Sequence, residues 1–294
     1  MSLRIVIVGP GRVGSALGRG LAQRGASVLG FVGRDPAHSA AAVRFCGAGS
    51  VLQWHDLPRA HVVLFAVGDG DLRAAVAHAV DVVPARQCSL WMHTSGRHDL
   101  SVFDAALPAG IRRGSLHPVA PFADAAAGLR AIAGAPAVLD GDPRSLRLLR
   151  RLCTWLGMVP IVGGGGDRVL YHAACALAAN GLTALHGAAA RAFAAAGVGP
   201  ADAHATLVEA LMAAALRSAS QRGAAAALSG PVRRGDVPTV LAHLEALARA
   251  APELLDTYRA LMGQAIELAA HAGLAAESVS RLRRVLSREP GLPG

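Results

Sequence analysis

The feature that most constrains the fold is a glycine-rich turn near the N-terminus. It reads Gly9, Pro10, Gly11, Arg12, Val13, Gly14. A run of Ile and Val precedes it at residues 4–8, and residues 13–24 have helical composition. At this spacing the first glycine permits a tight turn, the second lets a pyrophosphate approach the backbone, and the third lets the helix pack on the strand. A turn without ligand is the alternative, but this order of elements favours a dinucleotide site.

The end of the second predicted strand, about twenty residues further on, distinguishes NAD from NADP. An acidic residue there would hold the ribose hydroxyls of NAD, but the chain has Gly33 and Arg34 at this point. The planar guanidinium of Arg34 suits a 2′-phosphate, which favours NADP. Asp35 keeps NAD open, since a shift of one residue would bring its carboxylate to the ribose. Val67, at the end of another buried strand, is expected beside the cofactor, and Asp71 either caps the next helix or contacts the ligand.

Strand-like and helical segments alternate through the first half of the chain, which predicts a parallel sheet covered by helices. Strands are expected at residues 4–8, 27–32, 61–67, 89–93, 137–139 and 159–162, and helices at 13–24, 71–82 and 143–156. After four glycines at 163–166 the pattern is helical, with helices expected at 167–196, 200–221, 237–249, 252–272 and 275–287. Asp236 is expected to cap the third of these. We therefore predict an α/β domain over residues 1–165 and an all-α domain over residues 166–294.

The charge of the chain narrows the chemistry. The net charge is +9, and all 29 basic residues are arginine, so no lysine amine can form a Schiff base or donate a proton. Residues 1–165 hold 17 Arg against 10 Asp and no Glu, which fits an anionic ligand such as a phosphate. Nucleic acid is an alternative partner, but aromatic residues make up only 4% and form no stacking platform. We expect a small anionic metabolite and no nucleic acid.

Cysteine usage and hydropathy bear on the compartment. The four cysteines are scattered and form no CxxC pair, so neither disulfides nor a cysteine-based metal site is expected. The longest apolar stretch, 173–190, contains Asn180, Thr183 and His186, and no signal peptide is expected before the first strand. We expect a cytoplasmic protein without a membrane partner.

Polar residues after two buried segments are candidates for catalysis. Ser95 follows His93 and Thr94 at the end of a predicted strand, where ligands of open α/β sheets bind. His117 stands before a proline between apolar residues. It could give a proton to a carbonyl or imine as hydride arrives, or it could be a buried histidine satisfied by backbone groups.

The helical half carries further candidates. Tyr171, His172 and Asn180 project from a run of alanines and could orient a substrate, or they could be satisfied at a seam between helices. Arg234, beside another arginine and a glycine, could bind a carboxylate, or it could lie in a solvated loop. His172 and Cys175 share a helix face, but no further ligands are spaced for a metal, and none is expected.

Five segments in this order resemble the family of Rossmann-like and DUF2520 domain-containing proteins, over most of the chain from about Arg4 to Ala270. They read GPGRVGSALGRGL, HTSG, GSLHPVAPF, LYHAACALAAN and LSGPVRRGDVPTVLAHLEAL. The resemblance implies an NADP-dependent oxidoreductase with an N-terminal Rossmann domain and a helical C-terminal domain for substrate binding and dimerisation. The implied fold is similar to those of pyrroline-5-carboxylate reductase and 6-phosphogluconate dehydrogenase, and a homodimer is expected. The family's motif positions fall here on Ser95, His117, Tyr171, His172, Asn180, Arg234 and Asp236.

Some members of that family are ketopantoate reductases, so reduction of a C=O bond, possibly in ketopantoate, is the first functional hypothesis. The standard ketopantoate reductases resemble one another in using a catalytic lysine, which this chain lacks. A histidine, a tyrosine or an ordered water must then supply the proton. We expect His117 to be the donor, with His172 and Asn180 positioning the substrate. Reduction of a cyclic C=N bond, as in pyrroline-5-carboxylate reductase, is the alternative enzyme. A non-catalytic NADP-binding sensor is the alternative outside enzymes.

Overall fold

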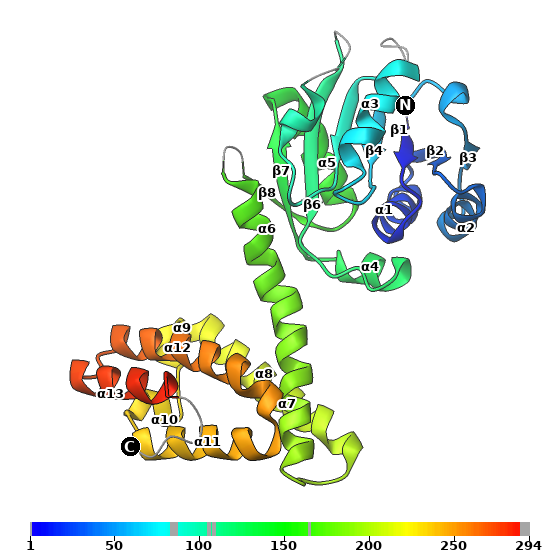
Figure 1. Cartoon of the computed structure of the whole chain (residues 1–294). Coiled ribbons are helices and arrows are strands. Elements are labelled where there is room, and N and C mark those ends of the chain that lie inside the picture. Colours follow the sequence, from blue (N-terminus) through cyan, green and yellow to red (C-terminus); the bar gives the residue numbers. More distant parts are fainter. Residues whose placement is uncertain (1, 83–87, 105–106, 108–109, 164–165, 289–294) are drawn as a thin grey trace. The chain divides into compact units, whose positions relative to one another are not determined.

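The structure, a computed structural model, describes residues 2–82, 88–104, 107, 110–163 and 166–288. It divides into two compact units, Met1–Ala179 and Asn180–Gly294. Figure 1 shows the strands in the first unit and helices alone in the second. The α/β fold with a Rossmann-type first half and a helical second half is therefore as predicted. The domain boundary was expected between residues 165 and 166. Residues 164 and 165 lie outside the described residues.

The first unit is built on a sheet of eight strands in the order β3-β2-β1-β4-β5-β6-β7-β8. The pairings are parallel except between β6 and β7, which run antiparallel. The strands are β1 (Arg4–Val8), β2 (Ser27–Val32), β3 (Ser50–Leu52), β4 (Val62–Phe65), β5 (Leu90–His93), β6 (Arg112–Pro118), β7 (Pro136–Gly141) and β8 (Val159–Val162). Because β1, β4, β5 and β6 are parallel, their carboxyl ends meet at one edge of the sheet.

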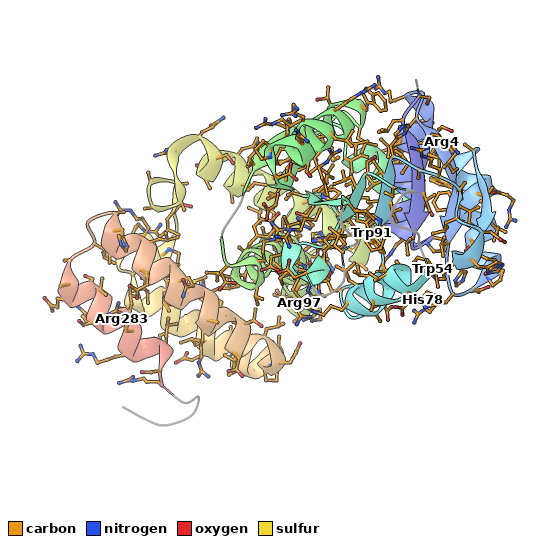
Figure 2. The ribbon with its side chains drawn as sticks, turned by 90° about the horizontal axis from the view of Figure 1, so that it is seen from above. Arg4, Trp54, His78, Trp91, Arg97 and Arg283 are labelled. Carbon is orange, nitrogen blue, oxygen red and sulfur yellow. The ribbon has the colours of Figure 1, made fainter. Side chains whose placement is uncertain are left out.

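Helical segments cover both faces of this sheet. They are α1 (Arg12–Gln23), α2 (Pro36–Cys46), η1 (Trp54–Asp56), α3 (Leu72–Val82), η3 (Leu100–Phe103), α4 (Ala125–Ala131) and α5 (Pro143–Trp155). Helix α6 (Arg168–Ala176) follows β8 in the chain. Alternate residues of β1 enter different cores: Ile5 and Ile7 pack with α1, α2 and α5, whereas Val6 and Val8 pack with α3 and η3. Trp91 of β5, among the strands in Figure 2, is fully buried in the second core. Both faces of the central strands are thus buried from solvent, as is typical of a parallel sheet.

Two strands were missed by the sequence analysis. The first, β3, has only three residues, and β6 begins with two arginines and contains Gly114, so neither resembles the apolar runs of the central strands. The antiparallel pairing of β6 with β7 corrects the expectation of a purely parallel sheet. The correction matters because β6 carries His117 to the same edge as the ends of β1, β4 and β5.

The second unit is helical. Its helices are α7 (Leu182–Ala195), α8 (Ala201–Arg222), α9 (Ala224–Ala227), α10 (Pro231–Arg234), α11 (Val237–Ala250), η5 (Pro252–Leu254), α12 (Leu255–His271) and α13 (Ala276–Leu286). Their core centres on Val240, Ile266 and Leu282, which are fully buried. Asp236 caps α11 as predicted, since its carboxylate accepts from the backbone N–H of Thr239.

A π-helical turn, η4 (Leu177–Gly181), joins α6 to α7, where one helix over residues 167–196 was expected. The whole stretch Arg168–Ala195 is long and apolar enough to cross a bilayer by length and composition alone. A single helix of this kind is weak evidence for a membrane span, because its apolar character comes largely from alanine.

Candidate functional site

The glycine-rich turn joins β1 to α1 with three glycines in three different environments. Gly9 has φ +102°, and a Cβ there would lie 2.5 Å from the carbonyl oxygen of Ala66, so only glycine fits. A Cβ on Gly14 would lie 2.1 Å from the carbonyl oxygen of Gly9, because the helix packs directly on the turn. Gly11 differs: a Cβ there would meet nothing within 4 Å. Gly9 and Gly14 therefore serve the fold, whereas Gly11 leaves open space for a ligand at the N-terminus of α1.

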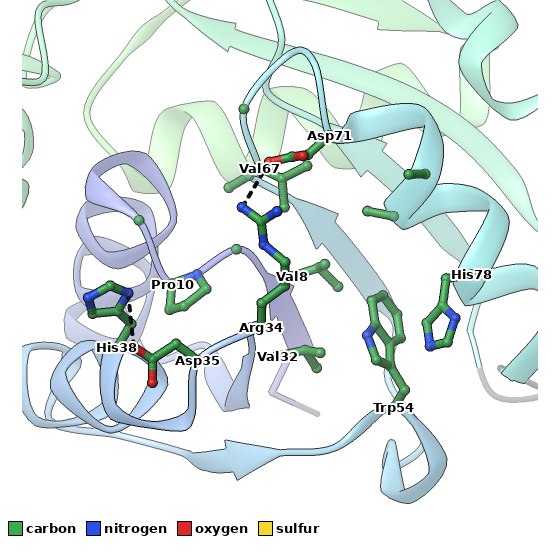
Figure 3. Close-up of a pocket in the computed structure, with 17 residues that line it drawn as sticks. Val8, Pro10, Val32, Arg34, Asp35, His38, Trp54, Val67, Asp71 and His78 are labelled. Atoms are coloured by element: carbon green, nitrogen blue, oxygen red, sulfur yellow. Dashed lines mark hydrogen bonds and ion pairs between the residues drawn. The ribbon is translucent and has the colours of Figure 1, made fainter.

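That open space belongs to a cavity of about 680 Å³, a size typical of small-molecule sites. Gly9, Pro10, Gly11, Arg34 and Val67 line it, which brings five of the predicted cofactor residues together (Figure 3). Arg12, Val13 and Gly14 begin α1 beside the cavity but do not line it. The turn, the exposed N-terminus of α1 and the arginine at the end of β2 fit a dinucleotide, with its pyrophosphate at Gly11.

Arg34 carries positive charge at the mouth of this cavity. Its guanidinium pairs with the carboxylate of Asp71 at 3.1 Å, and its side chain is 89% exposed. Asp71 directly precedes α3. Its carboxylate accepts a hydrogen bond from the guanidinium of Arg34. Asp35 instead caps α2 by accepting from Ala37 and lies 3.5 Å from His38. The carboxylate that would favour NAD is thus engaged in its own helix, while Arg34 extends over the cavity (Figure 3).

Two aromatic side chains at the far end of the cavity were missed by the sequence analysis. Trp54 of η1 and His78 of α3 pack edge to face with ring centroids 5.1 Å apart, and both line the cavity (Figure 3). Their position follows from β3, which pairs with β2 and leads the chain to η1. Recognising β3 as a strand would have drawn attention to Trp54, which follows it closely in the chain. With only three residues, β3 does not stand out in the sequence.

The loop after β5 is held by Ser95. Its hydroxyl donates to the carboxylate of Asp69 at 2.6 Å and accepts from the backbone N–H groups of Arg97 and His98. The side chain of His98 contacts the carbonyl of Asp69 at 3.0 Å. Ser95 thereby ties the ends of β4 and β5 together, which the sequence reading of Ser95 as a ligand contact did not anticipate. Asp69 was not singled out from the sequence.

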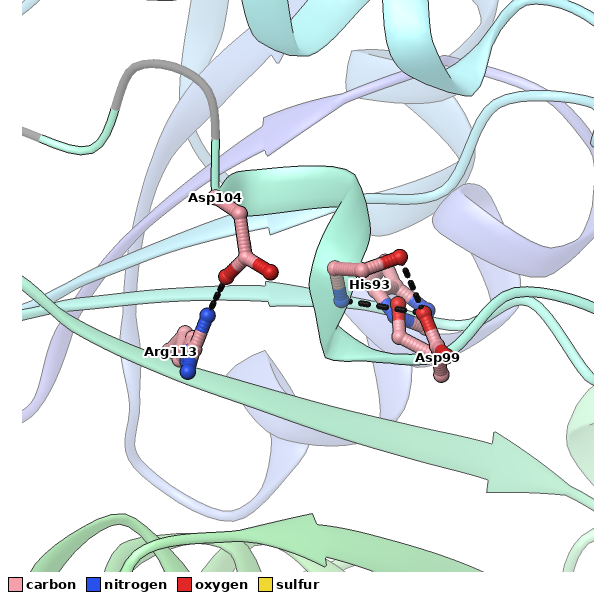
Figure 4. Close-up of polar contacts among 5 residues, drawn as sticks. His93, Asp99, Asp104 and Arg113 are labelled. Atoms are coloured by element: carbon pink, nitrogen blue, oxygen red, sulfur yellow. Dashed lines mark hydrogen bonds and ion pairs between the residues drawn. The ribbon is translucent and has the colours of Figure 1, made fainter. Parts of the chain in front are cut away.

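His93 has a structural role. It is fully buried, its Nε2 lies 3.2 Å from the carbonyl oxygen of Asp99, and its ring packs on Phe103 (Figure 4). Burial, with the nearby charge of Arg168, lowers the pKa of His93 to about 4. In the same view Asp104 forms an ion pair with Arg113 across from this loop. His93 therefore packs in the interior of the first unit and connects the end of β5 to η3.

His117 and Tyr171, which are 54 residues apart in the chain, form a hydrogen bond. The Nδ1 of His117 lies 2.7 Å from the hydroxyl of Tyr171, and the rings meet edge to face at 85°. Burial, the charge of Arg168 and then that of His172 lower the pKa of His117 to about 4. His117 is consequently a neutral imidazole at physiological pH, at the carboxyl edge of the sheet.

The other predicted substrate residues lie in different settings. His172 follows Tyr171 on α6 and is half-buried. Asn180 is exposed in the π-helical turn, and Arg234 ends α10, where its guanidinium lies 3.7 Å from Asp236. Asn180 and Arg234 belong to the second compact unit, so their roles as substrate ligands stay predictions. Within the described part of the chain, no group of three or more His, Cys, Asp or Glu could hold a metal ion.

Comparisons with known proteins extend this description. Residues 1–118 match the model of a Rossmann-like domain, and residues 135–266 match that of DUF2520, a domain of unknown function. No curated protein matches the chain.

Solved structures share the fold. A candidate NADP oxidoreductase from Bacteroides fragilis, BF3122, has a TM-score of 0.73 at 17% identity, over 90% of this chain and 98% of its own. Protein TM1727 from Thermotoga maritima has a TM-score of 0.59 at 20% identity, over 96% and 98%. A pyrroline carboxylate reductase from Plasmodium falciparum, solved with NADP bound, has a TM-score of 0.60 at 11% identity, over 95% and 98%. The two matched domains, in this order, place the chain in the family of Rossmann-like and DUF2520 domain-containing proteins.

Proposed function

We propose that this protein is an NADPH-dependent oxidoreductase that reduces a C=O bond of a small anionic metabolite. The observation that carries the proposal is Gly11, whose open side faces a cavity of about 680 Å³ lined by Arg34. A bound nicotinamide dinucleotide supplies hydride. The backbone of Gly9 to Gly11 would hold the pyrophosphate, and Arg34 would hold the 2′-phosphate that distinguishes NADP from NAD. The solved oxidoreductases that share the fold support the same class of cofactor.

No lysine is present to supply the proton, so another side chain or an ordered water must supply it. His117 is the residue we assign, since the β6 strand places it at the carboxyl edge of the sheet. The imidazole of His117 is neutral there. The proton donor is therefore the N–H group of the neutral ring and not an imidazolium ion. We take ketopantoate as the first substrate to try, on the resemblance to ketopantoate reductases within the family.

The test is an assay of purified protein with NADPH, in which nucleotide fluorescence is recorded before and after ketopantoate is added. Binding followed by loss of NADPH is the expected result. Binding without loss would refute ketopantoate, and pyrroline-5-carboxylate is then the substrate to add, because the fold is shared with a pyrroline-5-carboxylate reductase from Coxiella burnetii at a TM-score of 0.58. Binding with no turnover of either would favour a sensor, and no binding would refute the cofactor.

We also propose that the protein is a homodimer. Helix α8 has 22 residues, of which only His204 and Val208 are buried. Its Leu207 and Leu211, which lie one turn apart on the same face, are 36% and 62% exposed. A helix gains most of its stability from packing of an apolar face, and a second copy of the chain would cover this one.

The four cysteines, Cys46, Cys88, Cys153 and Cys175, are free thiols, which is consistent with the cytoplasmic location that we propose.

A further inference from the structure

The direction of the hydrogen bond between His117 and Tyr171 depends on which nitrogen of the imidazole carries the proton. A phenol hydroxyl can donate to Nδ1 only if that nitrogen is unprotonated, and the neutral ring then carries its proton on Nε2. Burial and the side chain of Cys175 raise the pKa of Tyr171, so its hydroxyl stays protonated at physiological pH. The distance of 2.7 Å fits a short, well-formed hydrogen bond.

The opposite side of the imidazole faces Gly96. A Cβ at Gly96 would lie 2.7 Å from Nε2 of His117 and 2.9 Å from its Cε1, so the ring occupies the space that any larger residue would need. Gly96 follows Ser95 in the loop after β5, where ligands of open sheets bind. Among the described residues the structure gives Nε2 no hydrogen-bond partner. Nε2 is thus the free polar atom of the pair.

A buried cation lies beside this pair. Arg168 is only 8% exposed, donates to the carbonyl oxygen of Ser95 at 3.2 Å, and lies 4.9 Å from the centre of the Tyr171 ring. Burial, which is the largest cause, acts with Arg168 and His172 against a positive charge on His117, and Asp69 favours that charge. The imidazole is therefore kept neutral, and its Nδ1 contacts the hydroxyl of Tyr171.

We propose that Tyr171 holds His117 as the neutral Nε2–H tautomer and replaces the proton that Nε2 gives to the substrate. The inference rests on the proposed reduction. The substrate oxygen, which gains an electron pair when its carbon accepts hydride, takes the proton from Nε2. A neutral imidazole that loses this proton would become an imidazolate, so Nδ1 takes the proton of the Tyr171 hydroxyl as the Nε2–H bond breaks. The phenolate then regains a proton from solvent. Tyr171 and His117 together do what a lysine ammonium does in other reductases.

The first test is spectroscopic and needs no substrate. Imidazole nitrogen shifts are recorded on ¹⁵N-histidine-labelled full-length protein between pH 5 and pH 9, with His117 assigned by the variant His117→Asn. We expect a protonated Nε2 and an unprotonated Nδ1 throughout, and a changed Nδ1 shift in Tyr171→Phe. A tautomer with the proton on Nδ1, or an imidazolium that forms near pH 6.5, would overturn the proposal.

The chain offers a matched control. Tyr258 and His243 form the same kind of pair in the helical unit, with Nδ1 2.8 Å from the hydroxyl and the rings at 84°. Tyr258→Phe therefore removes an equivalent hydroxyl within the helical unit and should leave the His117 signals unchanged. If a substrate is turned over, Tyr171→Phe should lower kcat about 100-fold or more without weakening NADPH binding, and Tyr258→Phe should do neither. If the predicted tautomer is observed but no substrate is turned over, the proposed function is refuted and the tautomer assignment stands.

Discussion

The substitution Gly11→Ala separates a nucleotide site from a turn that is merely rich in glycine. Gly11 has φ −79° and ψ −171°, an extended conformation that alanine adopts freely, and a Cβ there meets nothing within 4 Å. Replacing glycine at a compatible position stabilises by about 0.4–1 kcal/mol through the unfolded chain, and alanine at a helix N-cap costs a similar amount. The free energy of unfolding should therefore stay within about 1 kcal/mol of the original.

Cofactor binding should respond differently, because the added methyl group would occupy the space that a pyrophosphate needs. Loss of one hydrogen bond to a charged group costs about 1.5–3 kcal/mol, which weakens NADPH binding about 10- to 100-fold. Fluorescence titration gives the dissociation constant, and denaturant unfolding gives the stability. Gly263→Ala, which also adds a Cβ in open space but in α12, is the control and should bind NADPH normally.

Unchanged NADPH affinity in Gly11→Ala would refute the assignment of the turn. The variant Gly14→Ala completes the comparison, because its Cβ would lie 2.1 Å from the Gly9 carbonyl and should destabilise the fold by about 1–3 kcal/mol. If Gly11→Ala instead lowered the free energy of unfolding as strongly as Gly14→Ala, the statement that a Cβ at Gly11 meets open space would be contradicted as well.

Three further predictions concern the phosphate contact, the buried histidines and self-association. Arg34→Ala should weaken NADPH binding about 10-fold and leave NADH binding unchanged, whereas Arg44→Ala in the last turn of α2, outside the cavity lining, should change neither. Equal losses for both nucleotides would contradict the 2′-phosphate role. Because His93 and His117 have pKa values of about 4 against 6.5 when unfolded, the unfolded chain binds more protons between these values, so stability should be fully present above pH 6.5 and fall toward pH 4. Thermal unfolding from pH 4 to pH 8 measures this, and a flat profile would contradict it. Leu211→Arg should shift the mass in light scattering from two chains to one, while a single-chain mass for the unmodified protein would contradict the dimer.

Local patterns in the sequence were sufficient to predict the centre of the Rossmann unit. The strands β1 and β2 consist mostly of apolar residues and flank the glycine turn and its helix in the sequence, and their bounds are those predicted. Asp236 was found from its position before a proline-containing helix start. These features depend on neighbouring residues, so one sequence contains their signal.

The missed features depend on contacts between distant segments. The contact of His117 with Tyr171 joins residues 54 apart, and the space that Gly96 leaves for the imidazole depends on the pairing of β5 with β6. The aromatic pair Trp54 and His78 depends likewise on β3, a strand too short to show in composition. The residue types of the site could be predicted, whereas their partners required the fold.

Titration of the purified protein with NADPH and with NADH shows whether the cavity at the glycine turn binds a nicotinamide dinucleotide. We expect saturable binding of NADPH, seen as a change in nucleotide fluorescence, with weaker binding of NADH because Arg34 has no 2′-phosphate to contact. Saturable binding of neither nucleotide would contradict it.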